Sequence, residues 1–166
     1  MTPLLALFAL LPSAVAADAP RWTVTVDPLT YAIGYPHLQI ERAFGDHASV
    51  YVGPHFRLYD GILTEGHEPY RGAGVEAGAR WFPWGAAPEG AWLMGRTVVA
   101  QIWTTEGPEA QELGGYASAL AGYTGIVGGF LVLSGGAGFN YLYYDIAGMG
   151  ASGPFIALHT NVGVAF

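Results

Sequence analysis

The chain has 166 residues, enough for one domain or one small barrel, and its 25 glycines disfavour a helical bundle. Charged residues make up only 11% and aromatic residues 14%, and the lack of cysteine excludes disulfides, thiolate metal sites and a cysteine nucleophile. The net charge of −7, from 13 acidic and 6 basic residues without a basic stripe, argues against a nucleic-acid partner.

Residues 1–17 are predicted to be a cleaved secretory signal peptide. An apolar run over 4–11 precedes Pro12, and Ala14, Val15 and Ala16 supply the small residues of a cleavage site, although no Lys or Arg precedes the run. An N-terminal membrane anchor is the alternative, but the apolar run is too short to span a bilayer. We therefore expect a signal peptide over 1–17 and one barrel domain over 18–166.

The mature chain is predicted to contain eight strands with a period of two. They cover about 22–33, 37–45, 48–59, 72–82, 91–104, 114–124, 129–144 and 152–166. In the third, Val50, Val52 and Phe56 share one face, while His55 and Arg57 share the other. The mean hydropathy is +0.32, yet no segment after residue 20 reads as a membrane-spanning helix.

An apolar outer face and a small or polar inner face are typical of a membrane barrel, whereas a soluble sandwich has a charged second face. We therefore expect an all-β, eight-stranded, antiparallel, transmembrane up-and-down barrel. The alternative is a soluble all-β domain, such as a carrier of lipocalin-like shape whose apolar face lines a cavity.

The connections are predicted to differ between the two ends of the barrel. Residues 45–47, 83–90 and 125–129 would be periplasmic turns, and residues 60–71, 105–113 and 145–151 would be extracellular loops. Two of these loops are acidic through Glu65, Glu68, Glu106, Glu109 and Glu112. The first hairpin is the least defined, because Asp27 and Pro28 mark either a bulge or a strand end.

Aromatic residues near the strand ends are predicted to form girdles at the two membrane interfaces, where a ring with a polar tip is favoured. The residues of these girdles would be Trp22, Trp81, Trp84, Trp92, Trp103, Tyr143 and Tyr144.

The pattern resembles the small eight-stranded outer-membrane proteins of Gram-negative bacteria, of the OmpA-domain and OmpX type. Residues 27–59, "DPLTYAIGYPHLQIERAFGDHASVYVGPHFRLY", are similar to the start of the uncharacterised DUF3575-like barrels. The resemblance implies a bacterial outer-membrane location, with membrane lipids and lipopolysaccharide as partners, and it brings no activity. In the final segment, Val162, Val164 and Phe166 resemble the signal read by the barrel assembly machinery, with Asn161 where Gly is common.

Nine polar residues are predicted to face the lumen: Glu41, His55, Arg57, Glu76, Arg80, Arg96, Asn140, His159 and Asn161. Because an eight-stranded barrel is filled by its own side chains, buried charges there must pair. We expect Glu41 and Glu76 to pair with the three arginines. The set is interpreted as a polar core, and a proton- or ion-conducting role is the alternative.

No catalytic residue, cofactor or metal site is predicted. An enzyme acting on lipid A needs a nucleophile within reach of a base, and the mature chain offers only Ser49, Ser118, Ser134 and Ser152. The histidines, His37, His47, His55, His67 and His159, are scattered singly, without the paired spacing of a zinc site.

The resulting hypothesis is a small non-enzymatic outer-membrane barrel with a filled lumen and acidic loops. It would serve envelope integrity or an interaction with an unknown extracellular partner. The alternatives are a lipid A-modifying enzyme of deacylase or acyltransferase type, or a narrow pore.

Overall fold

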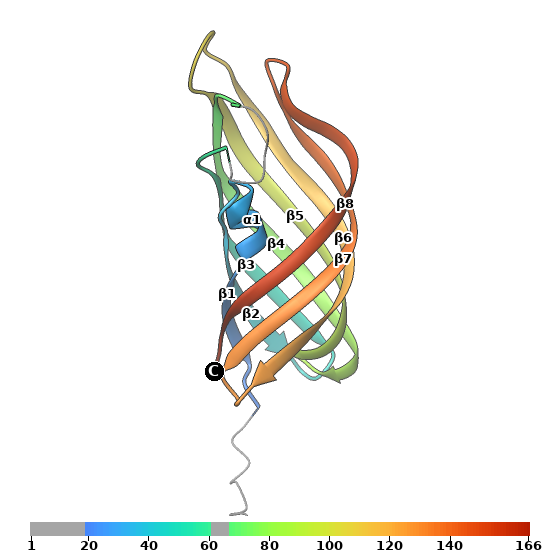
Figure 1. Cartoon of the computed structure of the whole chain (residues 1–166). Helices are drawn as coiled ribbons and strands as arrows, with labels where there is room; N and C mark the ends of the chain where they lie inside the picture. Colours follow the sequence, from blue (N-terminus) through green and yellow to red (C-terminus); the bar gives the residue numbers. More distant parts are fainter. Residues whose placement is uncertain (1–18, 61–66) are drawn as a thin grey trace, which may run out of the picture.

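A computed structural model describes residues 19–60 and 67–166, so the predicted signal peptide and Glu65 lie outside the described residues. Eight antiparallel strands follow one another around a closed barrel, and β8 returns to pair with β1 (Figure 1). The described helix is too short to cross a membrane. The elements are β1 (Trp22–Val26), α1 (Pro28–Ala32), β2 (Leu38–Phe44), β3 (Ala48–Arg57), β4 (Tyr70–Ala86), β5 (Glu89–Thr104), β6 (Gln111–Val127), β7 (Leu131–Ile146) and β8 (Met149–Ala165).

The all-β, up-and-down prediction is confirmed, and the two ends of the barrel are distinct. The lower end in Figure 1 carries the C-terminal residue and the turns between β2 and β3, β4 and β5, and β6 and β7. The upper end carries the connections between β3 and β4, β5 and β6, and β7 and β8.

The predicted first strand over 22–33 ends at Val26, so of the two alternatives for Asp27 and Pro28, a bulge or a strand end, the strand end is correct. The Asp27 carboxylate accepts hydrogen bonds from the backbone N–H groups of Leu29 and Thr30, and Pro28 follows at the first helical position. An Asp cap followed by Pro is a helix start, because Pro lacks the N–H that would be unsatisfied there. The chain therefore leaves the barrel wall after five residues and forms α1.

Most of the long strands extend further than predicted, and four connections are correspondingly shorter. The loop expected at 105–113 covers only 105–110, so Glu112 lies on β6. The predicted turn at 83–90 shrinks to Ala87 and Pro88, and the expected loop at 145–151 shrinks to Ala147 and Gly148. Both residues of the second pair have positive φ, 51° and 78°, as a tight two-residue hairpin turn requires. The turn predicted at 125–129 lies at 128–130, after β6 has continued to Val127.

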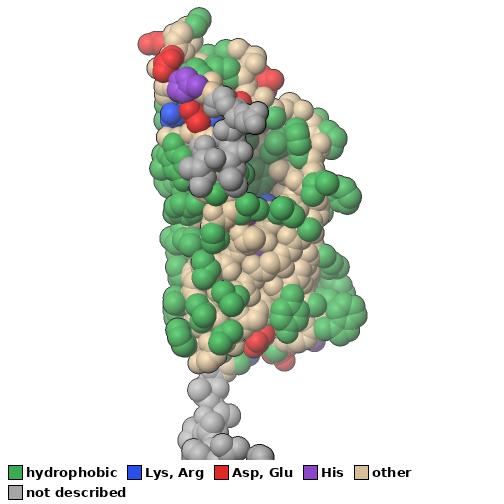
Figure 2. All heavy atoms as spheres, viewed as in Figure 1, with side chains coloured by type: hydrophobic (Ala, Val, Ile, Leu, Met, Phe, Trp, Pro, Cys, Tyr) green, Lys and Arg blue, Asp and Glu red, His purple; other side chains and the backbone are tan. Residues whose placement is uncertain are grey.

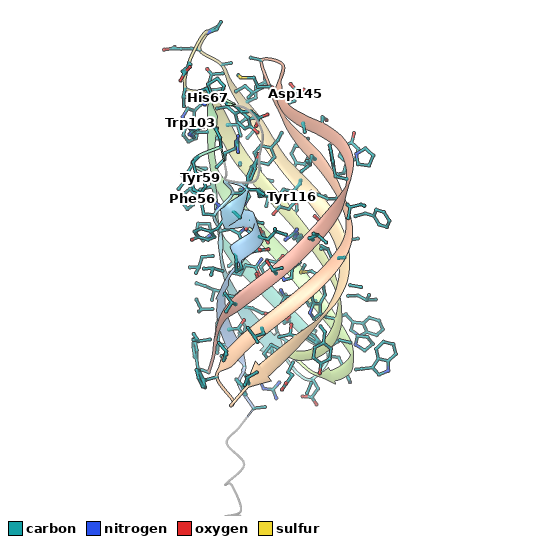
Figure 3. All side chains as sticks on the ribbon, in the orientation of Figure 1. Phe56, Tyr59, His67, Trp103, Tyr116 and Asp145 are labelled. Carbon is teal, nitrogen blue, oxygen red and sulfur yellow. The ribbon has the colours of Figure 1, made fainter. Side chains whose placement is uncertain are left out.

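Apolar side chains cover much of the outer face of the barrel (Figure 2). In the stick view, Phe56 points away from the barrel while Tyr116 lies inside it (Figure 3). The interior holds two apolar clusters. The lower one comprises Ala43, Tyr51, Phe82, Ala87, Trp92, Met94, Leu120 and Ala157. The upper one comprises Tyr70, Val98, Ala100, Ile102, Tyr116, Tyr144 and Ile146.

Candidate functional site: the polar lumen and the upper cavity

The nine residues predicted for the lumen all face the interior of the barrel. Eight of them are buried, with exposures between 0 and 7%, and Asn140 is half-buried. They do not form one network: two carboxylates organise separate groups between the apolar clusters, and Arg57 joins neither.

The lower group is centred on the ion pair between Arg80 and Glu41. Arg80 Nη1 donates to Glu41 Oε2 over 2.8 Å, and both side chains are almost fully buried. The same carboxylate accepts hydrogen bonds from the hydroxyls of Thr23 and Ser49. Arg80 Nη2 lies 2.9 Å from His159 Nε2. Because guanidinium groups only donate, this His159 nitrogen accepts, and the imidazole is neutral.

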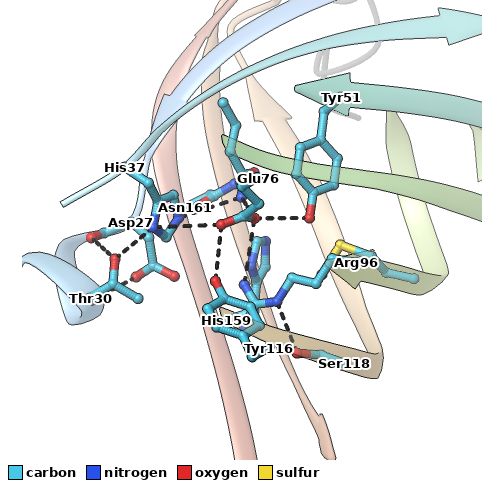
Figure 4. Close-up of polar contacts among 12 residues, drawn as sticks. Asp27, Thr30, His37, Tyr51, Glu76, Arg96, Tyr116, Ser118, His159 and Asn161 are labelled. Atoms are coloured by element: carbon cyan, nitrogen blue, oxygen red, sulfur yellow. Dashed lines mark hydrogen bonds and ion pairs between the residues drawn. The ribbon is translucent and has the colours of Figure 1, made fainter. Parts of the chain in front are cut away.

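The upper group is centred on Glu76 (Figure 4). Its carboxylate accepts from Gln39 Nε2 at 2.8 Å and from the hydroxyls of Tyr51 and Tyr116 at 3.0 Å each. The guanidinium of Arg96 lies 3.9 Å away, at the outer limit of an ion pair. The carboxylate is thus held by three hydrogen bonds that fix its orientation.

Polar side chains extend the upper group across the closure of the barrel. Asn161 on β8 donates to Thr25 Oγ1 at 3.0 Å and to Gln39 Oε1 at 2.6 Å. On the far side, Ser118 donates to Asn140 Oδ1 at 3.1 Å. The middle of the lumen is therefore polar and hydrogen-bonded from wall to wall.

The prediction that Arg57 pairs with Glu41 or Glu76 is wrong. Arg57 Nη2 donates to Glu68 Oε2 at 2.9 Å and lies 3.6 Å from Asp60 Oδ1. The physical reason is its height in the barrel: Arg57 is the last residue of β3, at the upper rim, where the acids of the next connection are closer than the lumen carboxylates.

Two residues assigned to the aromatic girdles lie inside the barrel instead. Trp92 is 1% exposed, and its indole N–H donates to Thr124 Oγ1 at 3.0 Å. A Cβ atom on Gly122 or Gly136 would lie 2.3 or 2.4 Å from the indole ring, so these two glycines make room for it. Tyr144 is the second such residue and packs in the upper cluster.

The other five girdle residues are on or near the outer face. Trp22, Trp81 and Trp84 are exposed toward the lower end, and Trp84 is the most exposed at 74%. Trp103 and Tyr143 are half-buried in the upper half, and the Tyr143 hydroxyl donates to the carbonyl of Val98 at 2.8 Å.

His37 was missed as a lumen residue by the sequence reasoning. It lies just before β2 and forms an isolated backbone bridge with His55, so the two histidines are cross-strand partners. The signal was available: pairing the second and third strands across the 45–47 turn puts Ile40 opposite Val52 and hence His37 opposite His55. The two histidines are therefore not scattered, contrary to the prediction.

A cavity of about 430 Å³ occupies the upper half of the barrel, within the range of small-molecule sites. Apolar and aromatic residues dominate its wall, and a few polar groups reach its floor. It is lined by Leu29, Thr30, Ile33, Tyr35, His55, Glu68, Tyr70, Arg96, Tyr116, Asn140, Leu142, Tyr144, Gly150, Ala151, Phe155, Ile156, Ala157 and Leu158.

The cavity lies beside the part of β8 that is paired with β7 but no longer with β1. The β1–β8 pairing runs only from Thr23↔Ala165 to Val26↔Val162, because β1 ends there. Just above, Thr160 binds the Asp27 carboxylate and so ties α1 to β8. Higher still, the wall of the cavity includes residues that are also exposed outside. The surface is hollowed on this face (Figure 2).

The upper connections are linked by a small polar cluster. His67 donates to Asp60 Oδ2 at 2.7 Å and contacts Glu106 Oε1 at 3.2 Å, which joins the β3–β4 and β5–β6 connections. Hydrogen bonding to these acids raises the pKa of His67, and hydrogen bonding from His67 lowers the pKa of Asp60.

Two further predictions concern the closing strand and the serines. Val164 and Phe166 are exposed and Val162 is half-buried, and their assignment as an assembly signal stays a prediction.

Among the described residues, no serine hydroxyl is hydrogen-bonded to a histidine. Thr30 Oγ1 lies 3.2 Å from His37 Nδ1, but its hydroxyl donates to the carbonyl of Asp27.

Comparison with protein-family models, with curated proteins and with solved structures finds no match to this chain. The resemblance to the DUF3575-like barrels therefore stays a prediction, and function has to be argued from the geometry.

Proposed function

We propose that this chain is a small outer-membrane barrel that does not conduct ions and that binds one acyl chain of a membrane lipid in its upper cavity. One observation carries the proposal: Ile156 and Leu158 line the cavity and are also 79% and 53% exposed on the outside of the barrel. The cavity wall is thus continuous with the outer apolar surface.

The outer surface supports placement in a membrane. Large apolar side chains such as Val52, Val75, Leu93, Val99 and Phe139 point outward from β3, β4, β5 and β7 and are exposed. Soluble monomers rarely expose contiguous apolar patches larger than about 300–600 Å². An apolar outside around a polar inside is the arrangement of a transmembrane barrel. Outer-membrane lipids and lipopolysaccharide are then the proposed surroundings, and the barrel assembly machinery the partner during insertion.

The packing of the lower lumen supports a barrel that does not conduct. Phe82, Trp92 and Met94 are buried together in the lower apolar cluster. Met94 and Trp92 of this cluster contact Arg80 of the Glu41–Arg80 pair. Ions would need a continuous aqueous path, and large side chains fill this section as expected for eight strands. A narrow pore is therefore the weaker proposal.

An acyl chain fits the cavity better than a polar solute does. Beside β8 the cavity lining continues into the outer apolar surface through Ile156 and Leu158, and this is the route by which we propose that a chain enters from the surrounding lipid. Tyr35, Leu142 and Phe155 offer apolar contact along the wall. Binding without chemistry agrees with the hydrogen-bonding pattern, since the described residues provide no serine–histidine pair for the lipid A-modifying alternative.

Lipid binding is tested by native mass spectrometry of the detergent-purified full chain with palmitate as the probe. We expect one bound equivalent for the wild type. Ala151→Phe, which fills the cavity from β8, should weaken binding at least tenfold, while Ala119→Phe, an exposed position on β6, should not. A folded A151F variant that binds palmitate like the wild type would refute the cavity as the site.

Membrane insertion is tested separately. The protein should fractionate with outer membranes and migrate differently in gels before and after boiling. Recovery as a soluble periplasmic protein with unchanged mobility contradicts the proposed location, whatever the palmitate result.

A further inference from the structure

We propose that His37, His55 and Glu76 bind one divalent transition-metal ion at the floor of the upper cavity. One ligand atom from each residue lies within 4.8 Å of the other two, and all three residues are buried. Two imidazoles and a carboxylate are a donor set suited to zinc and to other first-row divalent ions.

Two of the three donors lie on neighbouring strands, His55 on β3 and Glu76 on β4, and the third, His37, directly precedes β2 and is bridged to His55. The backbone bridge between His37 and His55 sets their rings nearly parallel, with centroids 6.0 Å apart and an interplanar angle of 21°. Glu76 on β4 is paired with Gly53, which lies two residues before His55 on β3 and so on the same face. Donors anchored in a sheet keep their mutual geometry, which is the usual requirement for a metal site.

His55 provides an independent indication of a ligand. It is 1% exposed, and neither of its ring nitrogens has a hydrogen-bond partner among the described residues. Leaving a buried polar group without a partner is unfavourable, and native structures rarely do so. The ring lines the cavity and lies in the same cluster as His37 and Glu76, so an ion bound there gives one nitrogen a partner.

Neighbouring groups already orient two of the three donors. The Thr30 hydroxyl donates to the carbonyl of Asp27, so Thr30 Oγ1, 3.2 Å from His37 Nδ1, accepts from that nitrogen and leaves Nε2 as the metal ligand. The long contact of 3.5 Å between the Gln39 amide nitrogen and Nε2 is given up on binding. The Glu76 carboxylate is held by two tyrosine hydroxyls at 3.0 Å. Such outer contacts fix ring and carboxylate orientation and are typical of metal sites.

The geometry also limits the affinity. Bonds of about 2.0–2.1 Å in a tetrahedral site put ligand atoms about 3.3 Å apart, so the side chains must draw closer on binding. The cation of Arg96 lies 3.9 Å from Glu76 Oε1 and opposes a second positive charge. With three protein donors, at least one coordination position stays open, and the cavity beside His55 is where a ligand oxygen can reach it.

The experiment is a titration of the chelator-treated, detergent-purified full chain with Co²⁺, followed by visible absorption, with Zn²⁺ as competitor. We expect one equivalent per chain. H55Q, H37Q and E76Q should each weaken binding at least tenfold. H159Q is the matched control: His159 is equally buried in the lumen but lies outside the cluster, so its loss should leave the affinity unchanged.

Folding of every variant is checked by heat-modifiable mobility. If a variant does not fold, X-ray absorption of the zinc-loaded wild type decides, since the site predicts two imidazole ligands. No Co²⁺ or Zn²⁺ binding by the folded wild type, fewer than two imidazoles on the zinc, or equal losses in H55Q and H159Q would each overturn the site. Because the donors belong to the barrel interior, these results do not depend on palmitate binding or on membrane location.

Discussion

Replacing Arg80 by Met removes the cation from the lower lumen while keeping a side chain of similar length. Glu41 then remains buried as an anion, and His159 Nε2 loses its donor. Two unit charges about 4 Å apart attract by about 4 kcal/mol at an effective dielectric constant of about 20. Breaking a buried pair by removing one partner costs about 3–5 kcal/mol in other proteins. We therefore expect R80M to lower the free energy of unfolding by about 3–5 kcal/mol.

The assay is urea-induced unfolding of the refolded barrel in lipid vesicles, followed by tryptophan fluorescence. The double variant E41L/R80M should lose less than either single variant, because it leaves no unpaired charge in the lumen. Arg42→Met is the matched control: Arg42 is exposed next to Glu41 in sequence and stacks over Trp22 and Phe44, at 5.1 Å from each ring. Exposed cation–π contacts contribute about 0.5–1 kcal/mol each, so its loss should cost at most about 2 kcal/mol. A loss below about 1 kcal/mol for R80M, or strictly additive losses in the double variant, would refute the reasoning.

Three further predictions follow from the structure. Gly53→Ala should prevent or strongly impair refolding, because the added Cβ would lie 1.6 Å from the carbonyl oxygen of Leu38. The control Gly95→Ala, whose Cβ meets nothing within 4 Å, should change the free energy of unfolding by less than about 1 kcal/mol. Equal unfolding midpoints for the two variants would contradict this prediction. In an NMR titration, Asp60→Asn should lower the raised pKa of His67. The stabilisation that His67 gives to the loop contact is complete below the ordinary histidine pKa and is lost as pH rises through the raised pKa of His67. The stabilisation that Asp60 gives is lost as pH falls through the lowered pKa of Asp60. An unchanged His67 pKa in D60N would show that the contact is absent in solution. Finally, the reconstituted barrel should be silent in planar bilayers, and steady single-channel conductance would contradict a lumen closed by its lower cluster.

The sequence predicted the strands, and which of their side chains point inward or outward, because both depend on a local alternation of residue types. In β3, Val50 and Val52 face outward while His55 and Arg57 face inward, and a period of two fixes that assignment without knowledge of the partners. The burial of Glu41, Glu76, Arg80 and the other lumen residues follows from the same alternation.

The ends of the strands were harder to predict, because Gly and Pro occur both in turns and at irregular positions within strands. Around Pro83 the sequence resembles a turn, yet the strands continue past it and a register shift between Trp81 and Trp84 absorbs the irregularity. At Asp27 and Pro28 the sequence allows a bulge or a strand end, and the structure shows the strand end, followed by a helix that Asp27 caps.

The sequence by itself determined a closed, eight-stranded barrel with an apolar outside and a polar inside, since alternation and turn spacing act over a few residues. Only the tertiary structure decided which charges meet, because height along the axis cannot be read from alternation: Arg57 at the rim binds loop acids, while Arg80 reaches Glu41. Inward-facing Trp92 likewise depends on two glycines on other strands. The cavity arises because β1 ends early and leaves the upper part of β8 paired with β7 alone, which no local pattern shows. The β2–β3 turn already pairs His37 with His55, but only the register between β3 and β4 brings Glu76 beside them.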